Sequence, residues 1–224
     1  MANNVLKVNG IAIANIAKLN GITDANLVKL NGEEFSGYNP TEAHTLIATR
    51  DIAVLGASSS ITITSGIDDT YDVYEFHFTN IHAETQGAFG FQVNNATDGA
   101  DYNDSLITST AARAYKADQD AGNLGYRTGV DLQQESSYQH LTEESGTNTS
   151  NGVSGVLTLY NPSSGTYVKH FVATVSDVYG GTSTATYYVA GYVNETTAID
   201  EISFKFAADE IQGGEIKMYG IAKA

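Results

Sequence analysis

Histidine and acidic side chains are the groups in this sequence best suited to acid–base or metal chemistry. The five histidines, at His44, His77, His82, His140 and His170, show no spacing that predicts a metal cage. The 26 acidic residues include no pair that stands out as the two carboxylates of a glycosidase. The phosphate-binding glycine loop, the His-Glu-x-x-His pattern and the Gly-x-Ser-x-Gly motif are missing. We therefore assign no catalytic residue and no cofactor, and we expect no enzyme.

The best candidate for a metal site is the segment Asp98–Asp104, which reads Asp-Gly-Ala-Asp-Tyr-Asn-Asp. Closely spaced oxygen ligands on a loop that contains glycine suit calcium. The segment departs from the EF-hand pattern, because Ala100 has no oxygen ligand and the distal Glu is missing. The alternative is a turn in which Asp and Asn side chains bond to their own backbone. The same alternative applies to Asp68-Asp69, and we assign no metal ligand.

Tyrosines in the C-terminal half could stack on sugar rings. The candidates for glycan contact are Tyr160, Tyr167, Tyr187 and Tyr188. Tyrosine is enriched at interfaces because its ring is apolar and its hydroxyl is polar. Strands also favour tyrosine for packing against neighbouring side chains. Plain packing is therefore the alternative for these four residues.

The elements that must position these side chains are strands. With 22 glycines, 14 tyrosines and only two prolines, the composition is typical of β structure rich in turns. In Tyr74–Phe78 the aromatic rings share one face and two polar residues the other, as in a sheet with one buried face, and Ile202–Phe206 repeats this alternation. Such runs, separated by turn residues, predict the following strands: Thr45–Val54, Ser60–Thr64, Tyr71–Ile81, Gly87–Val93, Gly155–Tyr160, Tyr167–Val175, Thr184–Val193, Ile199–Phe206 and Glu215–Ile221.

The spacing of the strands predicts an all-β fold, a jelly-roll-like β-sandwich. Residues 94–152 are polar and poorly periodic, so we expect long loops there and one short helix around Ala111–Lys116. Loops of this length in a sandwich are usually functional, or they pack against a neighbouring subunit.

The N-terminal stretch from Val5 to Gly37 repeats with a period of 11 residues. A fixed period is typical of stacked units, none of which buries its own apolar face. Each repeat has a lysine followed by Asn-Gly, and these residues are the docking candidates: Lys7, Asn9, Gly10, Lys18, Asn20, Gly21, Lys29, Asn31 and Gly32.

Two structures compete for this repeat. A period of 11 suits a right-handed helical supercoil, whereas Asn-Gly between apolar residues is a strong hairpin signal. A glycine in every repeat would also cost a helix about 1 kcal/mol each time. We favour β hairpins, which are too short to be stable alone. We expect the segment to be an anchor that is ordered in a symmetric oligomer, a trimer above all, or on a larger assembly.

The charge of the chain excludes some partners. With 26 acidic and 11 basic residues, the formal net charge is -15, which disfavours nucleic acid and anionic membranes. Cysteine is absent, so there are no disulfides and no thiolate sites. Met1–Gly10 shows no signal-peptide pattern, and no apolar run approaches the roughly 20 residues of a membrane-spanning helix. We expect synthesis in a cytoplasm and no membrane insertion.

The repeats and the β-rich remainder together resemble virion structural proteins of tailed phages, in particular those of marine and cyanobacterial phages. The segments that carry the resemblance are Ala12–Gly32, Ile67–Phe76, Leu159–Phe171 and Gly214–Ile221. They are structural motifs and imply no catalytic residues. The resemblance implies an appendage of the particle, either a tail or head fibre or a capsid decoration protein, assembled in the bacterial host.

A break rich in Gly, Asn and Pro after residue 36 divides the chain. We expect an anchor at 1–37, a linker at 38–45 and a β-sandwich at 46–224. The predicted function is a non-enzymatic, trimeric virion protein that displays the sandwich for adhesion, with other virion proteins and a host-surface glycan as further partners. The alternatives are a decoration protein that bridges capsomers, and a glycan-binding module or depolymerase.

Overall fold

The computed structural model describes residues 44–221, except 96, 98, 100, 118–121, 146–149 and 180–182, together with six two-residue strands before residue 44. The chain divides into two units, Met1–His44 and Thr45–Ala224. In the described residues, no helix has the length and apolar character needed to span a membrane.

The N-terminal unit contains one antiparallel hairpin in each repeat. The paired strands are β1 (Lys7–Val8) with β2 (Ile11–Ala12), β3 (Lys18–Leu19) with β4 (Ile22–Thr23), and β5 (Lys29–Leu30) with β6 (Glu33–Glu34). In every pair, an Asn-Gly lies between the two strands in the sequence. The prediction of hairpins is confirmed, and the helical supercoil is wrong, because each lysine-bearing strand pairs with the strand that follows it.

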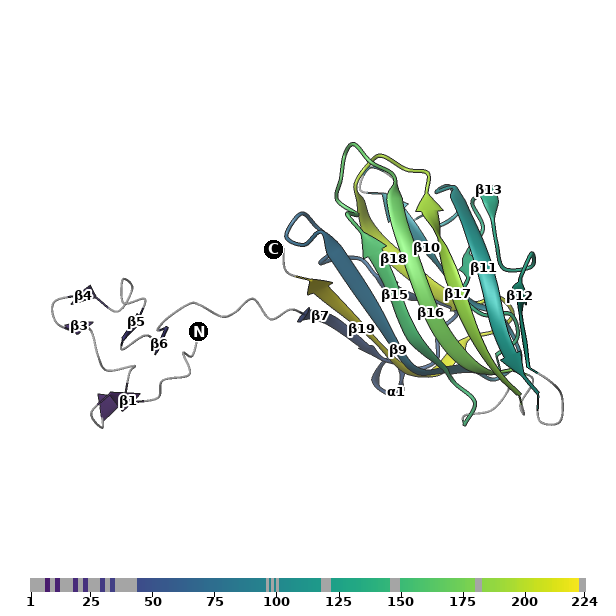
Figure 1. Ribbon diagram of the computed structural model, residues 1–224, viewed down its shortest axis with the longest axis horizontal. Helices are drawn as coiled ribbons and strands as arrows, with labels where there is room; N and C mark the ends of the chain where they lie inside the picture. The colour runs from purple at the N-terminus through teal and green to yellow at the C-terminus, as the bar shows by residue number, and fades with distance from the viewer. Residues whose placement is uncertain are drawn as a thin grey trace. The chain divides into compact units, whose positions relative to one another are not determined.

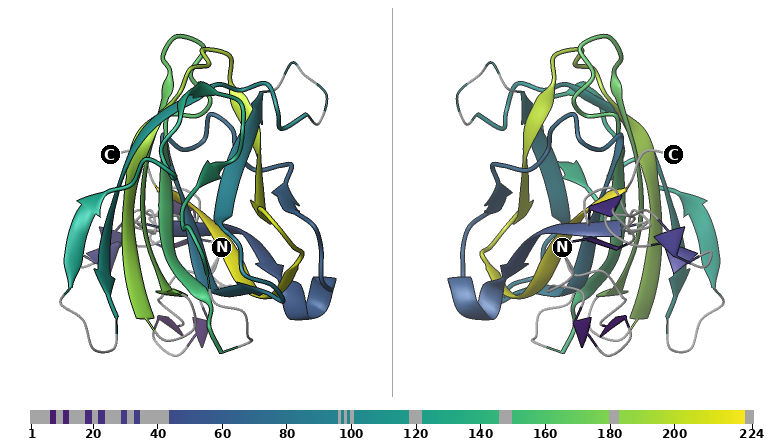
Figure 2. Two further views of the ribbon diagram at one scale, coloured as in Figure 1. Left: turned by 90° about the vertical axis from the view of Figure 1, so that its right-hand side faces the viewer. Right: turned by 90° about the vertical axis from the view of Figure 1, so that its left-hand side faces the viewer.

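The second unit is a sandwich of two antiparallel sheets (Figure 1), seen as separate layers in Figure 2. The large sheet has the order β12-β11-β17-β16-β15-β9-β19-β7, with β13 also paired to β11, and the small sheet has the order β14-β10-β18-β8. The elements are β7 (His44–Asp51), α1 (Ile52–Leu55), β8 (Ile61–Ile63), β9 (Val73–Ala83), β10 (Phe89–Asn95), β11 (Ile107–Lys116), β12 (Asn123–Tyr126), β13 (Gln133–Glu135), β14 (Gln139–His140), β15 (Val153–Tyr160), β16 (Lys169–Tyr179), β17 (Ser183–Val193), β18 (Ile199–Phe206) and β19 (Ile211–Ile221).

Eight long strands of the sandwich pair in a nested order. Strand β15 pairs with β16, β11 with β17, β10 with β18, and β9 with β19. This is the pairing of one long antiparallel hairpin wrapped around a core, which is how a jelly roll is built. The all-β sandwich predicted from the sequence is confirmed.

The core lies between the two sheets and is rich in aromatic rings. Phe204 of the small sheet packs against Phe76 and Phe78 of the large sheet, with ring centroids 5.6 and 5.3 Å apart. Phe91 and Phe171 meet across the layers at 5.1 Å in an edge-to-face arrangement. All five side chains are buried. Contacts between aromatic rings stabilise the fold by more than the burial of their area alone, and they fix how the two sheets face each other.

Every predicted strand has a counterpart, but three local predictions are wrong. The long loops expected in residues 94–152 are interrupted by the four strands β11 to β14. The first predicted strand continues to Val54, whereas β7 ends at Asp51, whose side chain accepts a hydrogen bond from the backbone of Ala53 and caps the short helix α1. The helix expected at Ala111–Lys116 is part of β11, which pairs with β17 along its whole length. Alanine, arginine and lysine favour a helix locally, but pairing within the sheet decides the conformation.

Candidate binding groove

The outer face of the small sheet is covered by two segments of the polar middle of the chain. The buried amide of Gln92 donates hydrogen bonds to the carbonyl oxygens of Ser105, Ser136 and Ser137, over 3.0 to 3.2 Å. These bonds attach both segments to the sheet, as expected because buried amides need partners. Ser203 is also buried, so the prediction that Ile202–Phe206 exposes its polar face to solvent is wrong at this residue.

A groove with a volume of about 600 Å³ lies beside this cover. The sheet contributes Gly90, His140 and Lys205 to its lining, and residues 128–132 and 135–138 contribute the flanking segments, together with Tyr102 and Asn103. This volume lies within the range of about 300–1,000 Å³ that is typical of small-molecule sites. The groove is therefore large enough to enclose a small ligand.

Gly90 lies in the middle of a row of three residues on adjacent strands. It is paired with His140 of β14 on one side and with Lys205 of β18 on the other. A methyl group at Gly90 would lie 2.6 Å from the carbonyl oxygen of Gln139, so β14 approaches too closely for any side chain here. Gly90 therefore contributes only backbone to the lining between His140 and Lys205.

Two tyrosine rings in the groove are held by their hydroxyl groups. The Tyr138 hydroxyl donates to Ser203 Oγ at 2.9 Å, and the Tyr102 hydroxyl donates to Glu201 Oε2 at 2.8 Å. The Nζ atom of Lys205 lies 4.1 Å from the centroid of the Tyr138 ring, a cation–π contact. Burial raises the pKa of both tyrosines, which keeps their hydroxyls protonated as donors.

The charged groups of the groove differ in their surroundings. Burial lowers the pKa of His140, and the nearby charge of Lys205 lowers it further, so the imidazole is neutral at pH 7. Within the described part of the chain, the Lys205 ammonium makes its cation–π contact but has no hydrogen-bond or ion-pair partner. The carboxylate of Asp131 accepts a hydrogen bond from the Tyr126 hydroxyl at 2.6 Å, and Glu135 brings a second carboxylate to the lining.

Together these groups can hold a ligand that both donates and accepts hydrogen bonds. An ammonium donates, carboxylates accept, and a neutral imidazole does both. Serine and threonine hydroxyls of the flanking segments add further donors and acceptors. Among the described residues, no group of three His, Asp or Glu side chains is placed to hold a metal ion. The arrangement is thus one for hydrogen bonding and stacking.

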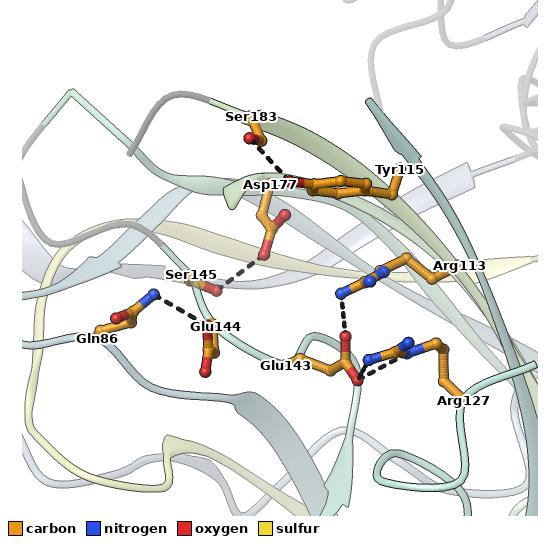
Figure 3. A network of polar contacts seen from close by, with 9 residues as sticks. All are labelled: Gln86, Arg113, Tyr115, Arg127, Glu143, Glu144, Ser145, Asp177 and Ser183. Carbon is orange, nitrogen blue, oxygen red and sulfur yellow. Dashed lines mark hydrogen bonds and ion pairs between the residues drawn. The ribbon is translucent and has the colours of Figure 1, made fainter. Parts of the chain in front are cut away.

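A second polar cluster, shown in Figure 3, is buried between the large sheet and the segment after β14. Glu143 accepts hydrogen bonds from two arginines: one carboxylate oxygen pairs with Arg113, and the other lies 2.8 Å from Nε of Arg127. The Arg113 guanidinium also lies between the rings of Tyr115 and Tyr179, at 4.9 and 4.8 Å from their centroids. This cluster fastens the segment to the sheet.

Asp177 belongs to the same cluster. Its side chain is only 3% exposed, and Oδ2 lies 3.4 Å from the Ser145 hydroxyl that donates to it (Figure 3). Burial raises the pKa of Asp177 to about 7, because the charged form loses its hydration there. A titratable group with this pKa affects stability near neutral pH, as argued below.

The tyrosines predicted to contact glycans do not form one surface. Tyr187 is 0% exposed, so its assignment is wrong; its ring belongs to the core because it faces inward from β17. Tyr160, Tyr167 and Tyr188 are 39%, 66% and 50% exposed. No ring contact joins these three within the residues that the structure describes.

The other sequence-based candidates are only partly described. Lys7, Lys18 and Lys29 each begin the first strand of a hairpin. The six Asn and Gly residues at 9–10, 20–21 and 31–32 lie outside the described residues, as do 98 and 100 of the calcium candidate. At Asp68, Oδ1 accepts a hydrogen bond from the Thr70 backbone at 2.9 Å, which confirms the interpretation of this residue as a turn.

The groove is not evident from the sequence, because its residues come from three strands and two covering segments. The only local signal is the mixture of Tyr, Ser and acidic residues in the poorly periodic middle of the chain. No protein-family model matches this chain, and no curated protein or solved structure matches it.

Proposed function

We propose that this chain is a non-enzymatic structural protein of a tailed-phage particle, in which the hairpin repeats attach or assemble the protein and the β-sandwich is displayed for adhesion. The observation that carries the proposal is the set of three hairpins repeated every 11 residues ahead of a separate sandwich. A displayed domain with its own attachment segment is the organisation expected of a particle appendage.

The hairpins need a partner surface to be stable. Each has strands of only two residues, and an isolated two-stranded hairpin is marginally stable at best in water. Repetition at a fixed spacing gives one chain three equivalent contacts, which strengthens docking on a symmetric or repetitive surface. The partner can be two further copies of the repeat, which gives a trimer, or the shell of the particle.

The two units differ in net charge. Residues 1–44 have four acidic and three basic residues, a net charge of -1, whereas residues 45–224 have 22 acidic and 8 basic residues, a net charge of -14. Like charge keeps displayed sandwiches soluble and apart, while the nearly uncharged repeats can approach a partner surface or each other without strong repulsion. This asymmetry supports a division of labour between attachment and display.

The mass of the full chain and of a variant that lacks residues 1–37, measured by light scattering, tests the assembly part of the proposal. We expect a trimer for the full chain and a monomer for the truncated chain. A trimer in both cases would contradict the role of the repeats. Monomers in both cases would favour the decoration protein, in which each chain docks singly on the shell.

The presence of the chain in the particle needs its own measurement. Mass spectrometry of purified phage particles should detect its peptides in a fixed ratio to the major shell protein. Detection only in the lysate supernatant would contradict the virion assignment. Incubation of the protein with host polysaccharide, with reducing ends as the readout, separates display from depolymerase activity: we expect no release of reducing ends.

A further inference from the structure

We propose that the groove beside the small sheet, lined by Tyr102, Tyr138, His140 and Lys205, is a saccharide-binding site that takes an uncharged hexopyranoside. The assignment rests on the proposed function, since it names what the displayed sandwich binds. It also replaces the strand tyrosines as the place of glycan contact.

The first argument is the row of Lys205, Gly90 and His140. The ammonium group has no hydrogen-bond partner among the described residues, and the neutral imidazole offers one donor and one acceptor. Gly90 lies between the two residues and contributes only backbone to the lining. Adjacent hydroxyls of a sugar ring present donors and acceptors side by side, which is the pattern that such a row can meet.

The second argument is the pair of tyrosines. Their hydroxyls are already bonded to Ser203 and Glu201, so the rings lose little freedom when a ligand arrives. A pyranose ring has an apolar C–H face and polar edges, and a tyrosine ring offers an apolar surface that suits that face. Rigid rings beside free polar groups match a ligand with this mixed character.

The third argument is charge. The lining contains the carboxylates of Asp131 and Glu135 against the single ammonium of Lys205, with His140 neutral. An anionic ligand would meet two negative charges here, in a chain whose net charge is -15. The carboxylates are strong hydrogen-bond acceptors, and the hydroxyl groups of a sugar can donate to them. An uncharged sugar is therefore favoured over a uronate, a sialoside or a phosphate.

The test is saturation-transfer NMR on the full chain, with the methyl α- and β-glycosides of glucose, galactose, mannose and N-acetylglucosamine at millimolar concentrations. Methyl glucuronoside serves as the anionic comparison. We expect binding of at least one uncharged glycoside and weaker binding of the glucuronoside. Lys205→Ala and Tyr138→Ala should each lower the affinity for the glycoside about tenfold, which is the effect of one lost contact.

Two control variants separate a lost contact from a disturbed fold. Tyr188→Ala and Tyr167→Ala each remove an exposed tyrosine that lies outside the groove lining. Both should bind within about twofold of the unchanged chain. The proposal is overturned if no uncharged glycoside binds, if the glucuronoside binds best, or if Tyr167→Ala abolishes binding while the groove variants do not. Binding of an extended peptide in place of glycosides would also overturn it.

The test of the saccharide site does not depend on the oligomeric state of the chain. A trimer that binds no glycoside overturns the saccharide site and leaves the role of the repeats intact. A chain that binds a glycoside through the groove but stays monomeric overturns only the trimer.

Discussion

The buried carboxyl group of Asp177 accepts a hydrogen bond from the Ser145 hydroxyl, with 3.4 Å between Oδ2 and Oγ. This contact joins β16 of the large sheet to the segment after β14, which continues along the small sheet. The link therefore ties the two layers of the sandwich together through a group whose pKa lies close to neutral.

Asp177 should make stability fall as the pH rises from about 4 to 7. Its pKa is raised in the folded state from 3.8 to about 7, so the folded chain holds a proton that the unfolded chain has released. The stabilising proton is fully present below about pH 4 and is lost as the pH passes through 7. Asp177→Asn stays uncharged at every pH. Its free energy of unfolding should therefore rise by on the order of 2–4 kcal/mol relative to the unchanged chain over this range.

Urea unfolding of both proteins at several pH values from 4 to 8 checks this prediction. The difference in the free energy of unfolding should grow with pH and level off above about 7. A difference that is the same at every pH would show that Asp177 is ionised in the folded chain across this range.

Arg113→Ala should destabilise the sandwich by about 3–5 kcal/mol, the cost of breaking a buried ion pair. The change removes the partner of one Glu143 oxygen and empties the space between the rings of Tyr115 and Tyr179. Lys217→Ala is the matched control, because Lys217 pairs with Glu215 at 2.6 Å where both side chains are about a third exposed. The control should change the free energy of unfolding by less than about 1 kcal/mol. Equal effects of the two variants would contradict the view that Arg113 is a structural anchor.

Gly90→Ala should destabilise the chain by about 1–3 kcal/mol and displace β14. The added methyl group would meet the Gln139 carbonyl oxygen at 2.6 Å, so the edge strand must move or bend. Gly165→Ala is the control, since a methyl group there would find no atom within 4 Å. Thermal unfolding gives the stability, and amide hydrogen exchange at Leu141, whose N–H donates to the Phe89 carbonyl at 2.7 Å, reports on the pairing of β14 with β10. Protection at Leu141 equal to that of the unchanged chain would rule out the close approach.

Much of the sandwich could be predicted because its strands show the period of two. Tyr74, Phe76 and Phe78 are all buried, while Glu75 and His77 lie on the half-exposed face, as their alternation predicts. The same rule also bears on the tyrosines: neighbours on a strand face opposite ways, so Tyr187 and Tyr188 cannot both be exposed on one face. Which of the two is buried depends on the pairing of β17.

The groove could not be predicted, because its geometry depends on pairing between distant parts of the chain. Lys205, Gly90 and His140 become neighbours only when β18, β10 and β14 assemble in register. A single sequence contains no signal for that register. The covering segments could not be predicted either, since the hydrogen bonds from Gln92 to Ser105 and Ser136 span 13 and 44 residues of the sequence. Local propensity does not report contacts of this range.

Changing Lys7, Lys18 and Lys29 to Glu should abolish assembly through the repeats. Each change lowers the net charge by two units, so residues 1–44 go from -1 to -7, in a chain whose residues 45–224 already have a net charge of -14. If the lysines meet acidic groups of neighbouring copies, repulsion replaces attraction and the trimer dissociates to monomers in light scattering. The triple change of the same residues to Arg keeps the charge and should keep the mass of the trimer. Salt at about 0.5 M should weaken the unchanged trimer by screening. A trimer that survives both the Glu changes and the salt would mean that apolar contacts between hairpins, without help from the lysines, hold the repeats together.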